Sequence, residues 1–234
     1  MLKVAAEAEE KLGFVLMEWW DGVGAARVLA REGDALLLER AEGTRSLVDY
    51  AYDGRDDEAT RILCDVAAIL HAPRPKLLPE LIPLKVWFRE LAPAALTHGG
   101  ILARSHALAE ALLREPRDAT VLHGDLHHAN VLDFGERGWL AIDPKRLHGD
   151  GGFDYANIFT NPDMDDPSRP VATIRETFLR RLGIVAAKSA IERRRLLEWI
   201  VAWTGLSAAW ILGDGDDPAV DLRVAELAIA ELDR

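Results

Sequence analysis

Two spacings of hydrophobic residues alternate along the first part of the chain, and each predicts a different element. Residues 7–20 repeat hydrophobic side chains every three or four positions, which predicts a helix. Residues 26–30 and 35–40 are short hydrophobic runs separated by the turn sequence EGD, so we expect a hairpin there. Residues 1–5 are typical of the end of a strand.

The middle of the chain is expected to be helical on both sides of a proline-rich connection. Residues 57–71 carry one continuous hydrophobic stripe, and Asp56 is a candidate N-cap for that helix. The segment "APRPKLLPELIPL" contains four prolines, which exclude regular helix and central strand and predict an ordered surface connection. A further helix is expected over residues 101–115 and should end before Pro116.

The second half of the chain predicts one β insertion within a helical region. Residues 121–144 have the pattern strand, loop, strand, turn, strand, with the turn at residues 135–138. From about Ser168 onward the spacing is helical in three segments. The order predicts an α+β fold with a small strand-bearing N-terminal part and a larger, mainly helical part, rather than a doubly wound sheet.

Composition and charge narrow the classes of function. The chain has 234 residues, of which 49% are hydrophobic and 29% charged, a balance typical of a soluble globular protein. Its net charge of -11 disfavours a nucleic-acid binder and suits a cationic small-molecule partner. The single cysteine, Cys64, excludes a disulfide within one chain, and no hydrophobic run reaches the ~18 residues of a membrane span. With acidic residues close to Met1 and no signal peptide, we expect a cytoplasmic protein that does not bind membranes.

The stretch "VLHGDLHHANVLDFGERGWLAIDP" concentrates the candidate chemistry and allows two interpretations. One is a metal site built on His123, His127 and His128. His123 and His127 have the i, i+4 spacing of helical metal sites, but Gly124 and the flanking strand pattern argue against a helix here. No cysteine is available to complete such a site. The sequence therefore disfavours a histidine-ligated metal.

The second interpretation is a phosphoryl-transfer site. Such a site needs a carboxylate beside the attacking hydroxyl and oxygen ligands for Mg²⁺. Asp125 follows a strand and a glycine, and Asn130 lies five residues later at the end of the same loop. Asp143 ends the second strand of the following hairpin, which should return its carboxylate to the neighbourhood of Asn130. We therefore predict Asp125 as the catalytic base and Asn130 and Asp143 as Mg²⁺ ligands.

The motif H-G-D-L-H-x-x-N, followed by a short hairpin and I-D-P, resembles the catalytic segment of the aminoglycoside phosphotransferase family. The longer stretch "RGWLAIDPKRLHGDGGFDYANIF" and "GLSAAW" resemble its streptomycin 6-phosphotransferase branch, also described as aminoglycoside/hydroxyurea resistance kinases. The resemblance extends from Lys3 nearly to the C-terminus. It implies a protein-kinase-like fold of two lobes, with residues 1–43 as a partial nucleotide-binding lobe with the hinge and residues 44–234 as the catalytic and substrate lobe.

The same resemblance implies a nucleotide site for ATP. Lys3 resembles the strand lysine that holds the α- and β-phosphates, and Glu10 matches the helix glutamate that pairs with it. Residues Glu39, Arg40 and Ala41 resemble the hinge whose backbone meets the adenine edge. The family places two strands and a phosphate-covering loop before this lysine, whereas this sequence has only two residues there. A truncated strand lobe is therefore expected, with weak or absent catalysis by these 234 residues alone.

The acceptor is expected to be a small hydroxylated cation such as an aminoglycoside, because carboxylates and aromatic faces bind amino and guanidino groups. Asp150, Asp154 and Asp214 are the candidate substrate residues, and Asp154 could instead cap the helix that begins at "GFDYANIF". Trp199, Trp203 and Trp210 share a helical spacing that favours a core stripe over a ligand platform, so we expect them in the core. Two alternatives stay open: a kinase of another metabolite, such as a sugar or amino alcohol, and a non-catalytic kinase-like remnant. The oligomeric state does not follow from the sequence.

Overall fold

A small antiparallel sheet and one helix form the N-terminal part of the molecule. The computed structural model describes the backbone of residues 1–4 and 8–234 and the side chains of residues 1–4 and 13–234. The elements of this part are β1 (Leu2–Val4), α1 (Ala8–Trp20), β2 (Val28–Glu32) and β3 (Ala35–Leu38). β3 lies between β1 and β2 and is antiparallel to both. The predicted helix and hairpin are confirmed, with β2 shifted by two residues from the predicted strand.

Two helices follow the N-terminal sheet after a connection at residues 39–46. They are α2 (Leu47–Tyr52) and α3 (Asp56–His71). Ser46 caps α2, because its hydroxyl accepts a hydrogen bond from Asp49 N–H. The prediction that Asp56 caps α3 is wrong: Asp56 is already in the first turn, where its buried carboxylate accepts hydrogen bonds from Arg181.

The proline-rich connection leads into a helical segment on the far side of the molecule. Its elements are β4 (Ile82–Pro83), α4 (Leu84–Trp87), the 3-10 helix η1 (Phe88–Glu90), α5 (Leu91–His98) and α6 (Gly100–Arg114). β4 pairs in parallel with β8 (Leu147–Asp150), which is also antiparallel to β5 (Ala119–Leu122). This small sheet joins the helical segment to the motif that carries the candidate chemistry.

A separate two-stranded hairpin carries the second half of the motif. It consists of β6 (Val131–Asp133), the 3-10 turn η2 (Gly135–Arg137) and β7 (Trp139–Ala141), and it confirms the predicted strand, turn and strand. The hairpin also contacts the N-terminal part, because Ala26 N–H donates to Ala141 O and Ala141 N–H donates to Gly24 O, both at 2.9 Å. The hairpin is therefore joined to the N-terminal part by backbone hydrogen bonds.

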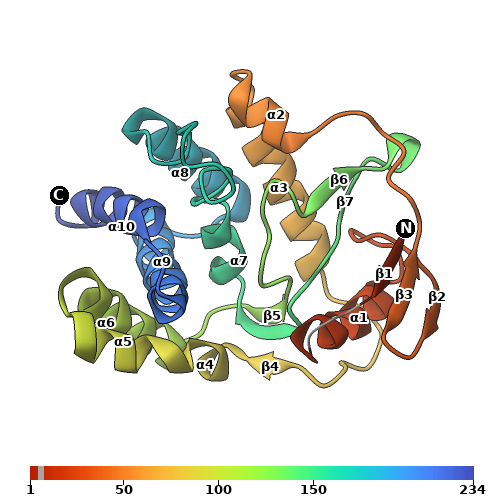
Figure 1. Cartoon of the computed structure of the whole chain (residues 1–234), viewed down its shortest axis with the longest axis horizontal. Helices are drawn as coiled ribbons and strands as arrows, with labels where there is room; N and C mark the ends of the chain where they lie inside the picture. The colour runs from red at the N-terminus through yellow and green to blue at the C-terminus, as the bar shows by residue number, and fades with distance from the viewer. Residues whose placement is uncertain (5–7) are drawn as a thin grey trace.

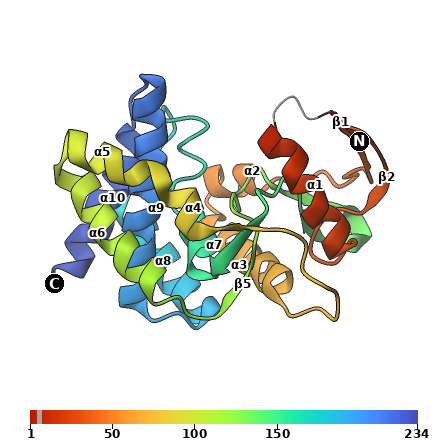
Figure 2. The same cartoon turned by 90° about the horizontal axis from the view of Figure 1, so that it is seen from below.

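Four helices complete the chain, namely α7 (Gly152–Asn157), α8 (Arg175–Ser189), α9 (Arg193–Asp214) and α10 (Ala219–Leu232). α9 is long and hydrophobic enough to cross a membrane, but 72% of that stretch is buried inside the protein, as expected of a central core helix. Figures 1 and 2 show α9 surrounded by α5, α6, α8 and α10, with β1, β2, β3 and α1 at the opposite end of the molecule.

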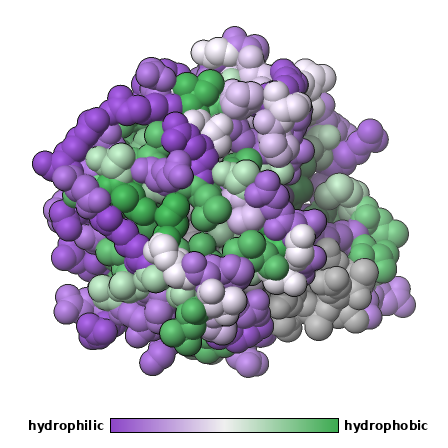
Figure 3. Space-filling view, turned by 60° about the vertical axis from the view of Figure 1, so that its left-hand side comes forward, coloured by the Kyte–Doolittle hydropathy of each residue, from purple (hydrophilic) through white to green (hydrophobic). Residues whose placement is uncertain are grey.

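One continuous cluster of buried hydrophobic residues connects the two ends. It runs from Trp20 and Leu36 in the N-terminal part, through Leu63 of α3, to Trp199 and Leu206 of α9. On the face shown in Figure 3, hydrophobic residues gather near the centre and hydrophilic residues surround them. The division into lobes at residues 43 and 44 stays a prediction.

Candidate active site

Asp125 lies in the loop that leaves β5, and the conformation of this loop depends on Gly124. Gly124 has φ +85°, a left-handed conformation that side chains rarely adopt. A Cβ there would also come within 2.8 Å of Leu147 and 2.9 Å of Lys145. Glycine therefore lets the chain turn closely against β8 and leaves the Asp125 side chain partly exposed at the start of the loop.

Asp154 holds this loop from behind. Its Oδ2 accepts His123 N–H and its Oδ1 accepts Gly124 N–H, both at 2.8 Å, and His71 Nε2 lies 2.8 Å from Oδ2. The side chain is completely buried. The prediction that Asp154 binds substrate is wrong, because a carboxylate with these three partners and no exposed surface cannot meet a ligand. The alternative that it caps α7 is also not what the structure shows; it fixes the two residues that precede Asp125.

The three histidines of the motif point to different partners. His123 is buried, stacks on Trp20, and places Nε2 2.8 Å from Ile142 O, while its Nδ1 accepts Asp125 N–H. Burial lowers the pKa of His123, which favours the neutral ring. His127 lies between Asp125 and Asn130, whereas His128 is buried in the core. Within the described part of the chain, no group of three His, Cys, Asp or Glu side chains could hold a metal.

The hairpin brings Asn130 next to the segment that contains Asp143. Ile142 N–H donates to Asn130 O at 2.9 Å, which brings the chain back beside the loop. Asp143 is the next residue, two positions beyond the end of β7. The Asn130 amide nitrogen donates to Asp125 O at 2.8 Å. That bond leaves the amide oxygen as the atom available to a cation. A carboxylate and an amide oxygen fit Mg²⁺, which prefers oxygen ligands and usually retains several waters.

Asp143 and Asp125 are each paired with a lysine. Lys3 of β1 forms an ion pair with Asp143, which places Lys3 at the predicted site. Burial raises the pKa of Asp143, but the hydrogen bond from Lys3 and the charge of Lys145 outweigh it, so the pKa lies below its ordinary value. Lys145 Nζ lies 3.2 Å from Asp125 Oδ2. Sequence reasoning missed Lys145, although its place two residues after Asp143 in "IDPK" was a usable signal.

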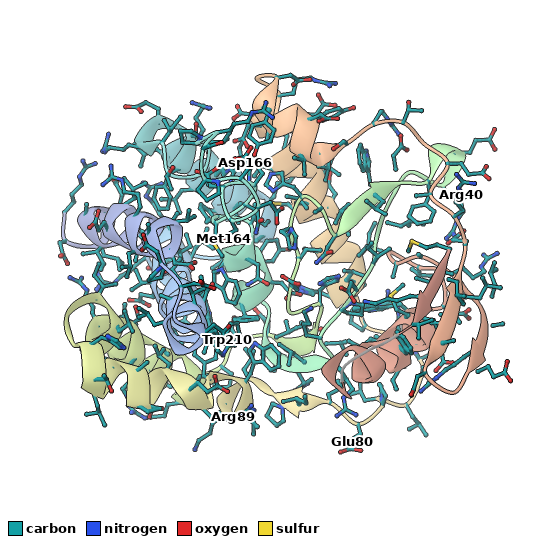
Figure 4. All side chains as sticks on the ribbon, in the orientation of Figure 1. Arg40, Glu80, Arg89, Met164, Asp166 and Trp210 are labelled. Carbon is teal, nitrogen blue, oxygen red and sulfur yellow. The ribbon has the colours of Figure 1, made fainter. Side chains whose placement is uncertain are left out.

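The predicted hinge, residues 39–41, borders a cavity that it shares with the β6–β7 hairpin. Glu39, Arg40 and Ala41 line a cavity of about 580 Å³ together with Met1, Leu132 and Phe134. Figure 4 shows Arg40 beside the turn of the hairpin. The Glu39 carboxylate is already bound by Arg137 and by Arg27 N–H, so the backbone of this segment is its candidate contribution to a ligand. Glu10 belongs to α1, but its side chain lies outside the described residues.

A second cavity lies against the helical part, and Lys145, the ion-pair partner of Asp125, is one of its lining residues. It measures about 530 Å³ and is lined by Trp87, Arg89, Glu90, Lys145, Trp210, Gly213 and Asp214. The rings of Trp87 and Trp210 meet edge to face, with centroids 5.5 Å apart. Figure 4 shows Trp210 and Arg89 at the same end of the helical part. Asp214, a predicted substrate residue, therefore lines this cavity, and its role in substrate binding stays a prediction.

Two other predictions concern Asp150 and the tryptophans of α9. Asp150 is buried and pairs with Arg195, while Arg117 N–H donates to its carboxylate at 2.9 Å. Those groups already occupy its oxygens, Asp150 lines a separate cavity of about 420 Å³, and its role in substrate binding stays a prediction. Trp199 and Trp203 are core residues, as predicted, but Trp210 is only partly buried and lines the cavity. Trp210 differs from Trp199 and Trp203 because it lies near the exposed C-terminal end of α9.

Comparison with known proteins identifies the family and the relatives of this chain. The model of a family described as aminoglycoside/hydroxyurea antibiotic resistance kinase matches residues 1–215. A streptomycin 3''-kinase of Klebsiella pneumoniae is 55% identical over 237 residues, which span 100% of this chain and 89% of that protein. A streptomycin 6-kinase of Streptomyces griseus is 30% identical over 98% of this chain and 75% of its own length.

Solved structures share the fold at lower identity. The aminoglycoside phosphotransferase APH(3'')-Id from Streptomyces rimosus, in complex with ADP and streptomycin, matches with a TM-score of 0.60 and 20% identity. The match covers 88% of this chain and 86% of that one. It confirms the predicted α+β, protein-kinase-like fold.

Proposed function

The chain belongs to the aminoglycoside/hydroxyurea antibiotic resistance kinase family, and we propose that it transfers the γ-phosphoryl group of ATP to a hydroxyl of an aminoglycoside, with streptomycin as the first candidate. The 55% identical relative is named a streptomycin 3''-kinase, which supports both the acceptor and the phosphoryl transfer. ATP is supplied in the cytoplasm, and we propose that the protein acts there.

One observation carries this proposal: Lys145 lines the aromatic and acidic cavity and also pairs with Asp125. Lys145 therefore connects the lining of this cavity to the carboxylate that would act on a bound hydroxyl. A general base must reach the proton that it removes, and a group bound in this cavity would be next to Asp125. On the other side of Asp125, Lys3 and Asp143 lie together at the end of the nucleotide-binding part.

The reaction can be written on these residues. The acceptor hydroxyl oxygen forms a bond to the γ-phosphorus, the bond from that phosphorus to the β,γ-bridging oxygen breaks, and ADP leaves. Asp125 orients the hydroxyl and accepts its proton. Asn130 and Asp143 would hold Mg²⁺, which when bound neutralises charge on the β- and γ-phosphates. Lys3 would hold the phosphates from the N-terminal side.

The nucleotide base is assigned to the cavity beside the hinge. Leu132 and Phe134 supply apolar walls, and the backbone of residues 39–41 supplies hydrogen-bonding groups along one side. Flat aromatic bases bind between apolar walls with a few fixed polar contacts. The hairpin connects this cavity directly to Asn130 and Asp143, so one rigid element spans the distance between base and phosphates.

The acceptor cavity suits a cationic, hydroxylated molecule. Glu90 and Asp214 can pair with amino or guanidino groups, and Trp87 and Trp210 offer faces that attract cations. The indole N–H of Trp87 is buried and has no hydrogen-bond partner among the residues whose side chains are described. A hydroxyl or ether oxygen of a sugar ring could accept that hydrogen bond.

A phosphate-transfer assay with a panel of acceptors tests the proposal. Purified protein, ATP and Mg²⁺ are incubated with streptomycin, a second aminoglycoside, hydroxyurea, a simple sugar and choline, and transfer is followed by ADP release and mass spectrometry. Streptomycin should gain one phosphate, and fragmentation should locate the modified hydroxyl. Transfer to choline or the sugar but not to streptomycin would support a metabolite kinase instead. No transfer to any acceptor would contradict the proposed function.

A further inference from the structure

The hinge segment, residues 39–45, is fastened at both ends to the β6–β7 hairpin. At its first end, the Glu39 carboxylate forms an ion pair with Arg137, which lies in the turn of the hairpin. At its other end, Gly43 N–H donates to Asp133 O at 3.0 Å, and Arg45 binds the Asp133 side chain. Figure 1 shows this segment passing close to the hairpin turn on its way to α2.

Asp133 is the centre of the second attachment. Arg45 donates to its two carboxylate oxygens through Nε at 2.7 Å and Nη2 at 2.8 Å, and Arg45 N–H donates at 3.2 Å. Gly135 N–H donates to the same carboxylate at 3.0 Å. The Asp133 residue is only 5% exposed, whereas Arg45 is half-exposed and packs its guanidinium over the Trp139 ring. A bidentate pair of this kind fixes geometry more tightly than a single contact.

Gly43 adds a steric constraint to this attachment. A Cβ on Gly43 would overlap the Asp133 carboxylate. The hinge backbone therefore lies directly against the Asp133 side chain, and no larger residue fits between them. The contact is tight enough that movement of the hinge away from β6 must break the Arg45 pair.

The nucleotide cavity lies between the two attachments. Leu132 and Asp133 are successive residues of β6, so their side chains point to opposite faces of the strand, and Phe134 directly follows the end of β6. Leu132 and Phe134 line the cavity together with the hinge residues 39–41, and Asp133 and Arg45 are not among its lining residues. The Arg45–Asp133 attachment therefore holds the two walls of the cavity together without reaching into it, whereas Glu39 of the first attachment is itself a lining residue.

We propose that the Arg45–Asp133 pair positions the nucleotide: it locks the hinge onto the hairpin, so that the base cavity and the Asn130–Asp143 end of the same hairpin keep a fixed separation. This inference rests on the assignment of the cavity to the nucleotide in the proposed function. Arg45 and Asp133 are positioning residues, since neither lines the cavity. If only a fraction of the molecules holds the arrangement that binds the nucleotide, the apparent Kd equals the intrinsic Kd divided by that fraction. Loss of the Arg45–Asp133 pair should lower the fraction.

The test compares Arg45→Gln with Arg55→Gln. Arg55 makes an equivalent forked pair with Asp53, at 2.8 Å through Nη2, on the exposed turn between α2 and α3, so its loss removes an arginine pair without touching the hinge. We expect Arg45→Gln to raise the Kd for ADP·Mg²⁺ about tenfold by calorimetry. Arg55→Gln should stay within twofold of the unmodified protein, and the Kd for streptomycin should stay within twofold in both variants.

The outcomes separate the inference from the proposed function. If the unmodified protein binds ADP and Arg45→Gln changes its Kd less than threefold, the inference is overturned and the proposed function stands. The inference is also overturned if Arg45→Gln raises the Kd for streptomycin by the same factor as the Kd for ADP. The Arg45–Asp133 pair would then only stabilise the fold. If the unmodified protein binds no ADP, both fail. Gly43→Ala, which attacks the same contact from the hinge side, should reproduce the effect of Arg45→Gln on ADP.

Discussion

Lys145 Nζ lies 3.2 Å from Asp125 Oδ2, and Lys145 N–H donates to His123 O at 2.7 Å. The lysine is thus tied by its backbone to the same loop whose carboxylate it contacts. Its charge also acts on Asp143. Because Lys145 also lines the cavity proposed for the acceptor, it contacts both that cavity and the carboxylate proposed as the base.

Removal of this charge should slow transfer more than it weakens binding. In Lys145→Met, Asp125 loses its ion pair and the transferred phosphoryl group loses a nearby positive charge, so we expect kcat to fall about 10²-fold or more. Lys145→Arg should retain part of the rate, because the charge is kept. Steady-state kinetics with ATP and streptomycin give kcat and the KM for streptomycin. A KM for streptomycin that rises tenfold with unchanged kcat would mean that Lys145 only binds the acceptor.

Asp154 should matter for catalysis although it cannot touch substrate. In Asp154→Asn one oxygen becomes an amide, so either His123 N–H or Gly124 N–H loses its acceptor and the loop before Asp125 loosens. We expect kcat to fall at least tenfold, with nucleotide affinity within threefold of normal. His71→Gln should give a milder version of the same result. Kinetics together with ADP calorimetry check this, and a wild-type kcat in Asp154→Asn would contradict it.

Asp214 should contribute to acceptor binding alone. Asp214→Asn removes one exposed carboxylate from the cavity, and an exposed charge pair contributes roughly 0.2–1 kcal/mol, so the KM for streptomycin should rise about 1.4- to fivefold. The KM for ATP should not change. Asp216→Asn is the matched control, since Asp216 is an exposed acid two residues away that does not line the cavity. Equal effects of both substitutions would show a general charge effect and no contact at Asp214.

Asp221 should make stability depend on pH. Burial raises the pKa of Asp221 to about 7, an effect that its hydrogen bond with Ser207 only partly offsets. A raised carboxyl pKa means that the contribution of this group to stability is full below about pH 4, falls as pH rises, and is lost above about 7. Asp221→Asn should therefore raise the Tm by several degrees at pH 8 and not at pH 4. A Tm gain of equal size at both pH values would contradict this.

The sequence predicted much of the centre of the site because its chemistry is local. Asp125 and Asn130 lie five residues apart in one loop, and a hairpin between Asn130 and Asp143 follows from the turn residues around Gly135 and Gly138. Lys3 was placed by resemblance, and the ion pair with Asp143 agrees with it. These predictions needed only spacing, turn chemistry and a motif.

The substrate residues were predicted less well because acidity alone does not reveal burial. Asp150, Asp154 and Asp214 look alike in the sequence, yet the first two are buried and bound by Arg195 and by the backbone of the loop. Only Asp214, beyond the buried part of α9, reaches the cavity. The attachments of the hinge to Asp133 and Arg137 join residues about 90 positions apart, so they depend on tertiary structure that no local pattern encodes.

The most direct test of the phosphoryl-transfer centre is the movement of label from [γ-³²P]ATP to streptomycin in the unmodified protein and in Asp125→Asn. Asn at this position keeps the shape of the side chain but cannot accept the hydroxyl proton. The unmodified protein should label streptomycin, and Asp125→Asn should transfer label about 10²- to 10⁴-fold more slowly while it binds ADP with normal affinity. Transfer by Asp125→Asn at the rate of the unmodified protein would contradict the assignment of this carboxylate and, with it, the mechanism.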